Sequence, residues 1–297
     1  ALLLLPALLG GCSLQRLAAR AAGGALAAGG ATWGADDDPE LVREALPFAL
    51  KTIEGLLAAD PENRRLLLAA ASGFTQYAQG FLVPEADLLE ETDFAASRAG
   101  RERAGRLLGR ATGYGLRGLA TFRPGFPEEL RDAGRREAAL AALDRQAVPF
   151  LYWTAASWGA RTALALDDPA LAADLPLAER LMGRARDLDP SFGDGAIHDF
   201  DIAWEGGRAA AAAGASGRAR EALAEALRHA RGRRAAPLVA FAESVAVATQ
   251  DREEFSRLLG EALALDADAS GEHRLANILA QRRARWLLAH TDDLFLE

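Results

Sequence analysis

Apolar residues recur every three or four positions through residues 39–297, the spacing that places them along one face of an α-helix. The first such stretch carries Leu41, Ala45 and Phe48 after the pair Asp38-Pro39, which supplies an N-cap and a proline at the first helical position. No stretch alternates apolar and polar residues as a half-buried strand would. The pattern therefore predicts an all-α fold.

The predicted helices end at a recurring turn. Residues 59–63 (ADPEN) end the first helix and cap a second, so the two form an antiparallel hairpin. Similar turns follow at Leu188-Asp189-Pro190 and Leu265-Asp266-Ala267, and their intervals divide into units of about 40 residues, slightly longer than a tetratricopeptide repeat. Because one hairpin cannot bury its own apolar face, we expect four to five irregular tetratricopeptide-like hairpins stacked as a short α-solenoid.

The N-terminal apolar run ends in Leu9-Gly10-Gly11-Cys12, the pattern at which bacterial lipoprotein signal peptides are cut. Cys12 is the only cysteine of the 297 residues. We expect residues 1–11 to be the signal peptide, although its basic n-region is missing from a sequence that begins at Ala1. A lipidated Cys12 and a flexible Ala/Gly-rich tether would then fill residues 12–38, and residues 39–297 would form the helical domain. The alternative is an incidental or buried cysteine behind a hydrophobic first helix.

The apolar run is too short to span a bilayer, which takes about 20 residues. Three acyl chains, at about 0.8 kcal/mol per buried methylene, would hold the protein on a membrane stably. Ser13 follows the cysteine in place of the aspartate that commonly retains lipoproteins in the inner membrane of enteric-type bacteria. We therefore expect a lipid-anchored protein on the periplasmic side of the cell envelope, at the outer membrane.

Charge and motifs exclude several function classes. The net charge of −8 and the pI of about 5.2 give a nucleic-acid partner no electrostatic support. The sequence holds no nucleophile-elbow, P-loop, HExxH or Cys/His zinc spacing, so we expect no catalytic residue, no metal and no cofactor. Residues 113–118 match GxGxxG, but a charged helical stretch precedes them where a dinucleotide site needs a strand, so close helix contact or a kink explains these glycines better.

Residues 147–160 are rich in aromatic side chains and carry no charge. A helix that is apolar all round is buried, either in a core or against a ligand cavity, whose walls are often aromatic. Tyr152, Trp153 and Trp158 of this stretch, with Tyr77 of the first hairpin, are therefore candidates for lining a ligand channel.

The helix predicted after Gly193 sets a polar stripe beside an apolar one that ends in Trp204. The polar stripe consists of Asp194, His198, Asp201 and Glu205. It is too spread for one metal ion, which leaves a solvated face or a polar strip that lines a cavity or meets a partner. We take His198, Asp201, Trp204 and Glu205 as candidate lining residues.

Arg282 projects in the same direction as the apolar residues Leu279 and Trp286 of the last predicted helix. A buried arginine needs a carboxylate, so we expect Arg282 to pair with Asp201 or Glu205. The alternative is an arginine that snorkels past a thin edge of the core. Arg282 and Trp286 complete the candidate lining residues.

Four runs of the sequence resemble the T-component lipoproteins of tetratricopeptide-associated TRAP transporters, the TatT family. They are residues 45–81, 148–160, 173–200 and 274–295. The resemblance implies a periplasmic, lipid-anchored homotrimer with a channel through each protomer. It also implies docking of the periplasmic solute-binding protein, the P-component, whose ligand is a small hydrophobic or organic-acid-like molecule.

We therefore expect a non-enzymatic accessory of solute uptake that binds and aligns its partner's ligand. The alternative is a tetratricopeptide-type scaffold lipoprotein in cell-envelope protein assembly. An envelope hydrolase is poorly supported, because no acid/base or nucleophile set is visible.

Overall fold

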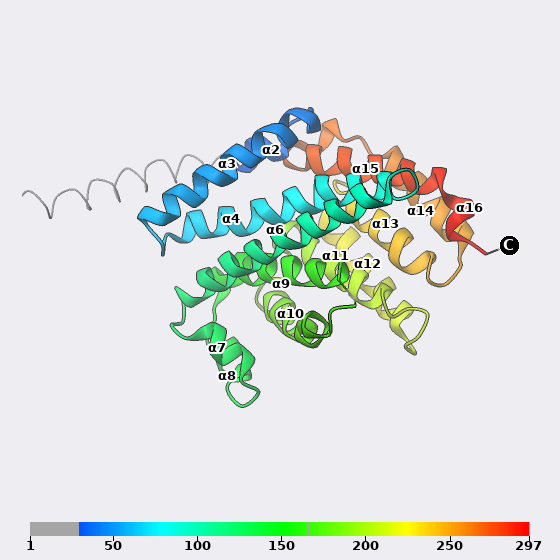
Figure 1. Ribbon diagram of the computed structural model, residues 1–297. Helices are drawn as coiled ribbons and strands as arrows, with labels where there is room; N and C mark the ends of the chain where they lie inside the picture. The colour runs from blue at the N-terminus through cyan, green and yellow to red at the C-terminus, as the bar shows by residue number, and fades with distance from the viewer. Residues whose placement is uncertain (1–29, 166, 297) are drawn as a thin grey trace, which may run out of the picture. The chain divides into compact units, whose positions relative to one another are not determined.

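The computed structural model describes residues 30–165 and 167–296, and in them the chain is helical without a strand (Figure 1). The predicted all-α fold is confirmed. The predicted signal peptide and Cys12 lie outside the described residues. Of the predicted tether, the end from Gly30 to Gly34 is helical. The solenoid arrangement of the hairpins stays a prediction.

Helices follow one another along the chain with short connections, and Figure 1 carries their labels. They are α2 (Gly30–Gly34), α3 (Pro39–Ala59), α4 (Arg64–Tyr77), the π-helix η1 (Ala78–Leu82), α5 (Val83–Leu89), α6 (Phe94–Ala120), α7 (Phe126–Arg131), α8 (Arg136–Ala141), the 3₁₀ helix η2 (Arg145–Ala147), α9 (Val148–Ala163), α10 (Pro169–Leu188), α11 (Phe192–Gly206), α12 (Ala215–Ala230), α13 (Ala236–Phe241), the π-helix η3 (Ala242–Ala246), α14 (Arg252–Ala264), the 3₁₀ helix η4 (Asp268–His273), α15 (Arg274–Ala289) and α16 (Thr291–Leu294).

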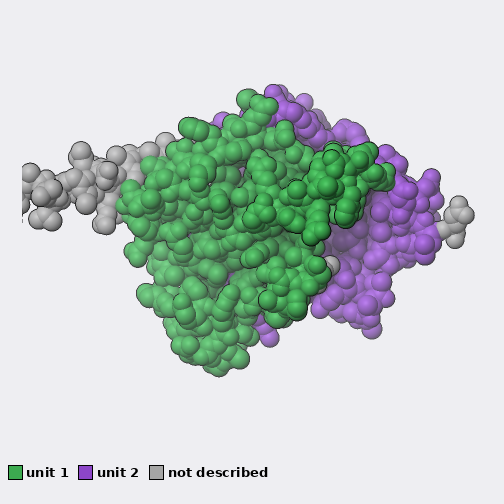
Figure 2. Space-filling model, in the orientation of Figure 1, with its two compact units in different colours: residues 1–31, 41–143, 153–179 green, residues 32–40, 144–152, 180–297 purple. Residues whose placement is uncertain are grey.

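Two compact units make up the chain, coloured separately in Figure 2. Among the described residues, unit 1 contains residues 30 and 31, Leu41–Leu143 and Trp153–Glu179. Unit 2 contains Thr32–Glu40, Asp144–Tyr152 and Arg180–Glu297. Helices α9 and α10 each contribute residues to both units.

The predicted turns coincide with helix ends. Asn63 caps α4, since its side-chain oxygen accepts hydrogen bonds from the backbone N–H groups of Arg65 and Leu66 at 3.1 and 3.2 Å. Helix α10 ends at Leu188, the first residue of the second turn, and α14 ends at Ala264, immediately before the third. Proline and capping side chains therefore located these ends correctly.

The apolar face predicted for α3 is not the buried one. Leu41 is 57% exposed and Phe48 is 80% exposed. The side chains that α3 buries are Val42, Leu50, Ile53 and Leu57. The apolar residues of α3 form two stripes, and only the tertiary packing selects the one that enters the core.

Close packing in unit 1 explains the glycine motif of α6. A Cβ atom placed on Gly115 would lie 2.1 Å from Oγ1 of Thr154 on α9, whereas one on Gly113 would meet nothing within 4 Å. Nearby, the buried hydroxyls of Thr112 and Ser157 lie 2.9 Å apart and form a hydrogen bond between the same two helices. Gly115 therefore serves helix contact, one of the two roles expected for these glycines.

The buried face of α15 in unit 2 carries polar side chains. Asn277 is 1% exposed, accepts a hydrogen bond from the backbone N–H of Ala235 and donates one to the carbonyl of Arg233. Gln281 donates to the carbonyls of Ala262 and Leu265, where α14 ends. These two amides satisfy backbone groups that other helices leave without partners.

The predicted pairing of Arg282 is wrong. Arg282 lies outside the buried face of α15, its side chain is 46% exposed, and it forms an ion pair with Glu40 at the start of α3. Asp201 and Glu205 pair with other arginines. The prediction failed because it assumed that the apolar stripe of α15 faces the core. The buried face of α15 instead contains Asn277 and Gln281, and Arg282 lies outside it.

One stretch of the described residues, Arg64–Leu89, is long and apolar enough to cross a membrane. Its most apolar window is 56% buried, which is typical of a core helix in a folded unit, so this composition is weak evidence for a membrane span.

Candidate functional site

Helix α11 of unit 2 opens on three residues with left-handed backbone conformation: Gly193, Asp194 and Gly195, with φ of 60°, 52° and 86°. Asp194 therefore does not continue the helical stripe of His198, Asp201 and Glu205, as the sequence predicted. Position 195 requires glycine for two reasons. Its φ is positive, and a Cβ atom on it would lie 2.8 Å from Cβ of His229 on α12. This close contact brings the start of α11 against the end of α12.

Carboxylates of α11 pair with arginines from other elements of unit 2. The pairs are Asp194–Arg233, Asp199–Arg234, Asp201–Arg186 and Glu205–Arg218. Burial by itself would raise the pKa of Glu205, but the hydrogen bonds from Arg218 and Arg208 lower it by more. The net pKa lies below the ordinary value, so the carboxylate stays charged at neutral pH. The acidic stripe is thus neither a metal array nor a solvated face, but one side of an ion-pair network.

The most buried of these pairs is Arg234–Asp199. Arg234 is 9% exposed, and its guanidinium donates to both oxygens of the Asp199 carboxylate and to the backbone carbonyl of Asp194. Burial by itself would lower the pKa of Arg234, but the neighbouring Asp199 carboxylate raises it by more, so the net pKa lies above the ordinary value. The site therefore contains a permanent, largely desolvated cation.

Aromatic side chains accompany this ion pair. The rings of Tyr152 and Phe192 lie 5.2 Å apart between centroids. Burial raises the pKa of Tyr152, and the charge of Asp199 raises it further, so the phenol stays protonated. We name Tyr152, Phe192, Asp199 and Arg234 the Arg234 cluster, which combines an aromatic wall with hydrogen-bonding groups as small-molecule sites do.

Two buried polar atoms of α11 lack a hydrogen-bond partner among the described residues. They are Nε2 of His198 and Nε1 of Trp204. The Trp204 ring stacks against Phe200 at 6.0 Å, and the Arg208 guanidinium lies 5.1 Å from its centroid. Buried polar groups are nearly always hydrogen-bonded, so a water molecule or a ligand is expected at each of these two atoms.

Comparison with known proteins agrees with the envelope-protein interpretation of the sequence. The family model described as the TRAP transporter T-component (TAtT) matches residues 35–295. The chain belongs to this family. An uncharacterized protein of Treponema pallidum (strain Nichols) is 31% identical over 264 residues, which cover 88% of this chain and 82% of that protein. The chain is therefore an accessory component of a TRAP transport system, associated with the periplasmic side of the envelope. The T-component family is a transporter family and not an enzyme family.

The candidate lining residues of this T-component divide between its two units. Tyr77, Trp153 and Trp158 belong to unit 1, and the rest of the described candidates belong to unit 2. Tyr77 and Trp158 are 6% and 3% exposed, so both are core residues of unit 1. In unit 2, Trp286 stacks on His290 with 4.4 Å between ring centroids.

Within unit 2, the structure brings two candidates together, because Nδ1 of His198 lies 3.7 Å from Oδ2 of Asp201. Sequence reasoning missed five residues of this region: Phe192, Asp199, Glu225, His229 and Arg234. One signal was available, since Glu225 and His229 are four residues apart and therefore share a helix face.

Two groups of side chains in unit 2 have the donor atoms of a metal site within 4.8 Å of one another. The first group is Asp194, Glu272 and His273. Its Asp194 accepts hydrogen bonds from Arg233 and His273 at 2.6 and 2.8 Å. Burial by itself would raise the pKa of Asp194, but these contacts lower it by more, so the net pKa lies below the ordinary value. The carboxylate is therefore satisfied without an ion. The second group is His198, Glu225 and His229.

Proposed function

We propose that this T-component docks the solute-binding P-component of its TRAP system and aligns or passes the ligand through a helical channel. The match of the T-component family to residues 35–295 carries this proposal. The Arg234 cluster supports a small organic ligand with both apolar and polar parts, because an aromatic pair adjoins a buried cation. We also propose a homotrimer, as the family resemblance implies.

Helix α3 supplies a surface for the docked protein. Leu41 and Phe48 lie seven residues apart, hence on one face, and are 57% and 80% exposed. Large aromatic side chains with this exposure are enriched in protein interfaces. We assign this face to the P-component.

Co-purification tests the docking. The full chain, isolated from envelope extracts, is expected to retain a TRAP solute-binding protein, with the ligand identified by mass spectrometry. Phe48→Glu is expected to reduce retention about tenfold or more, because it sets a charge in an apolar contact. The matched control is Leu296→Glu, which alters a side chain that is 87% exposed outside this face. Equal retention by both variants contradicts the assignment, and an altered oligomeric state of Phe48→Glu assigns the face to contact between copies of the chain.

We further propose that the T-component is anchored through acylated Cys12. Cys12→Ser is expected to move the protein from the membrane fraction to the soluble periplasmic fraction, because no acyl chain can be attached. Ser13→Asp is the matched control. It keeps the cysteine and is expected to shift the protein from the outer to the inner membrane of an enteric-type host. Membrane association that survives Cys12→Ser would refute the lipid anchor.

A further inference from the structure

His198 presents a buried ring nitrogen that no described residue satisfies. The residue is 5% exposed, and its Nε2 has no hydrogen-bond partner among the described residues. On the other side of the ring, Nδ1 faces the Asp201 carboxylate at 3.7 Å, and Asp201 is fixed in turn by Arg186. A carboxylate beside one ring nitrogen is the arrangement that orients the other nitrogen of a metal-binding histidine.

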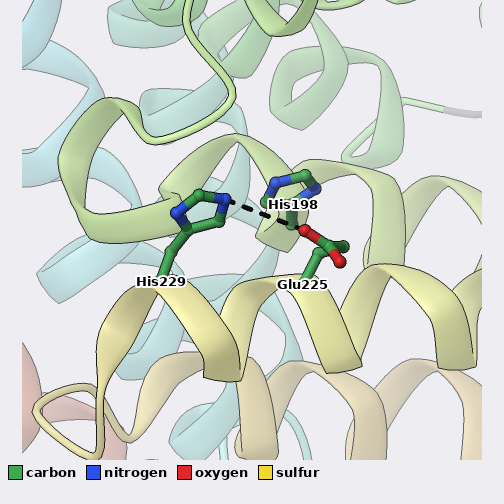
Figure 3. A group of neighbouring side chains, drawn as sticks. All are labelled: His198, Glu225 and His229. Carbon is green, nitrogen blue, oxygen red and sulfur yellow. Dashed lines mark ion pairs between the residues drawn. The ribbon is translucent and has the colours of Figure 1, made fainter.

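Two further donors approach His198 from α12. Glu225 and His229 lie on one face of that helix, and Oε2 of Glu225 is 3.8 Å from Nε2 of His229. The rings of His198 and His229 are stacked, with 5.5 Å between centroids and 8° between planes. Figure 3 shows the two side chains of α12 gathered against His198 on α11. One ligand atom from each residue lies within 4.8 Å of the others.

His229 is held in the protonation state that binds metal ions. Its Nε2 lies 2.8 Å from Nη2 of Arg228. Since a guanidinium only donates, Nε2 is the acceptor and carries a lone pair.

A cation already contacts two of these three ligands. Arg228 pairs with Glu225 as well as with His229, yet its side chain is 61% exposed and can turn away into solvent. Two imidazoles and one carboxylate are a donor set that zinc prefers, and three protein ligands leave a fourth position open.

We propose that His198, Glu225 and His229 bind one zinc ion, which displaces Arg228 and links α11 to α12. The sequence expectation of no metal considered only ligands close together in the chain or on one helix. Here one ligand comes from α11 and two from α12, and only the packing of these helices assembles the set. This proposal is independent of P-component docking.

Calorimetric titration of the chelator-treated full chain with Zn²⁺ tests the site. We expect one zinc per chain and a higher melting temperature in its presence. His198→Gln, His229→Gln and Glu225→Gln are each expected to lower the affinity about 100-fold or more, and Asp201→Asn, a positioning variant, about 10- to 100-fold. Arg228→Gln is expected to raise the affinity, because the competing cation is removed. The visible spectrum of bound Co²⁺ provides a second readout of the ligand set.

The matched controls are His273→Gln and His290→Gln, which remove the other two histidines and are expected to bind zinc as the parent does. Circular dichroism checks that each variant is folded. Glu225, whose side chain is 47% exposed, is the ligand whose replacement disturbs packing least. Absence of stoichiometric binding to the parent overturns the proposal. So does binding that survives Glu225→Gln unchanged, or binding that only the control variants abolish. Because the titration needs no partner protein, it fails or succeeds separately from co-purification.

Discussion

Arg234→Met is expected to lower the free energy of unfolding by about 3–5 kcal/mol, the range for removing one partner of a buried ion pair. The side chain of Asp199 is 21% exposed, and burial already raises its pKa even with Arg234 beside it. Without Arg234, this carboxylate must stay charged in a poorly solvated place or take up a proton. Denaturant unfolding monitored by circular dichroism measures the loss.

Two comparisons make this prediction specific. Arg234→Met combined with Asp199→Leu is expected to recover most of the stability, because it removes both charges and leaves neither unpaired. Arg252→Met breaks a pair whose side chains are 57% and 88% exposed, and is expected to cost less than about 1 kcal/mol. If Arg234→Met costs no more than Arg252→Met, the Arg234 cluster does not depend on its ion pair.

Gly115→Ala is expected to lower the stability of the T-component by about 1–3 kcal/mol, the usual cost of overpacking. The added Cβ would lie 2.1 Å from Oγ1 and 3.3 Å from Cα of Thr154, so a side-chain rotation alone cannot clear it. Gly113→Ala, two residues away on α6, meets open space and is expected to stabilise the helix by up to about 1 kcal/mol. The same denaturant experiment measures both variants. Changes of the same sign would contradict the close contact between α6 and α9.

Interactions that lie close together along the chain were predicted well. The turn that Asn63 caps, and the helix ends at Leu188 and Ala264, follow from prolines and capping residues within a few positions. The helical hairpin of α3 and α4 could be predicted for the same reason.

Predictions that needed a choice between two helix faces were less successful. Leu41 and Phe48 form a regular apolar stripe on α3, yet both are exposed. On α15, buried Asn277 and Gln281 are polar, and their role is to bind backbone groups of other helices. Periodicity reports side-chain polarity but not what a neighbouring helix requires, so the partner of Arg282 was misassigned.

Residue order alone was enough to show that this protein is all-helical, where several of its helices end and that it resembles the T-component family. These properties depend on caps, spacing and residue runs that act within a few turns of helix. The folded chain was needed to show that Arg234 meets Asp199, that Arg282 meets Glu40 and that His198 joins two ligands of α12. Such contacts join residues from different helices, and their geometry depends on how the side chains of both helices pack together.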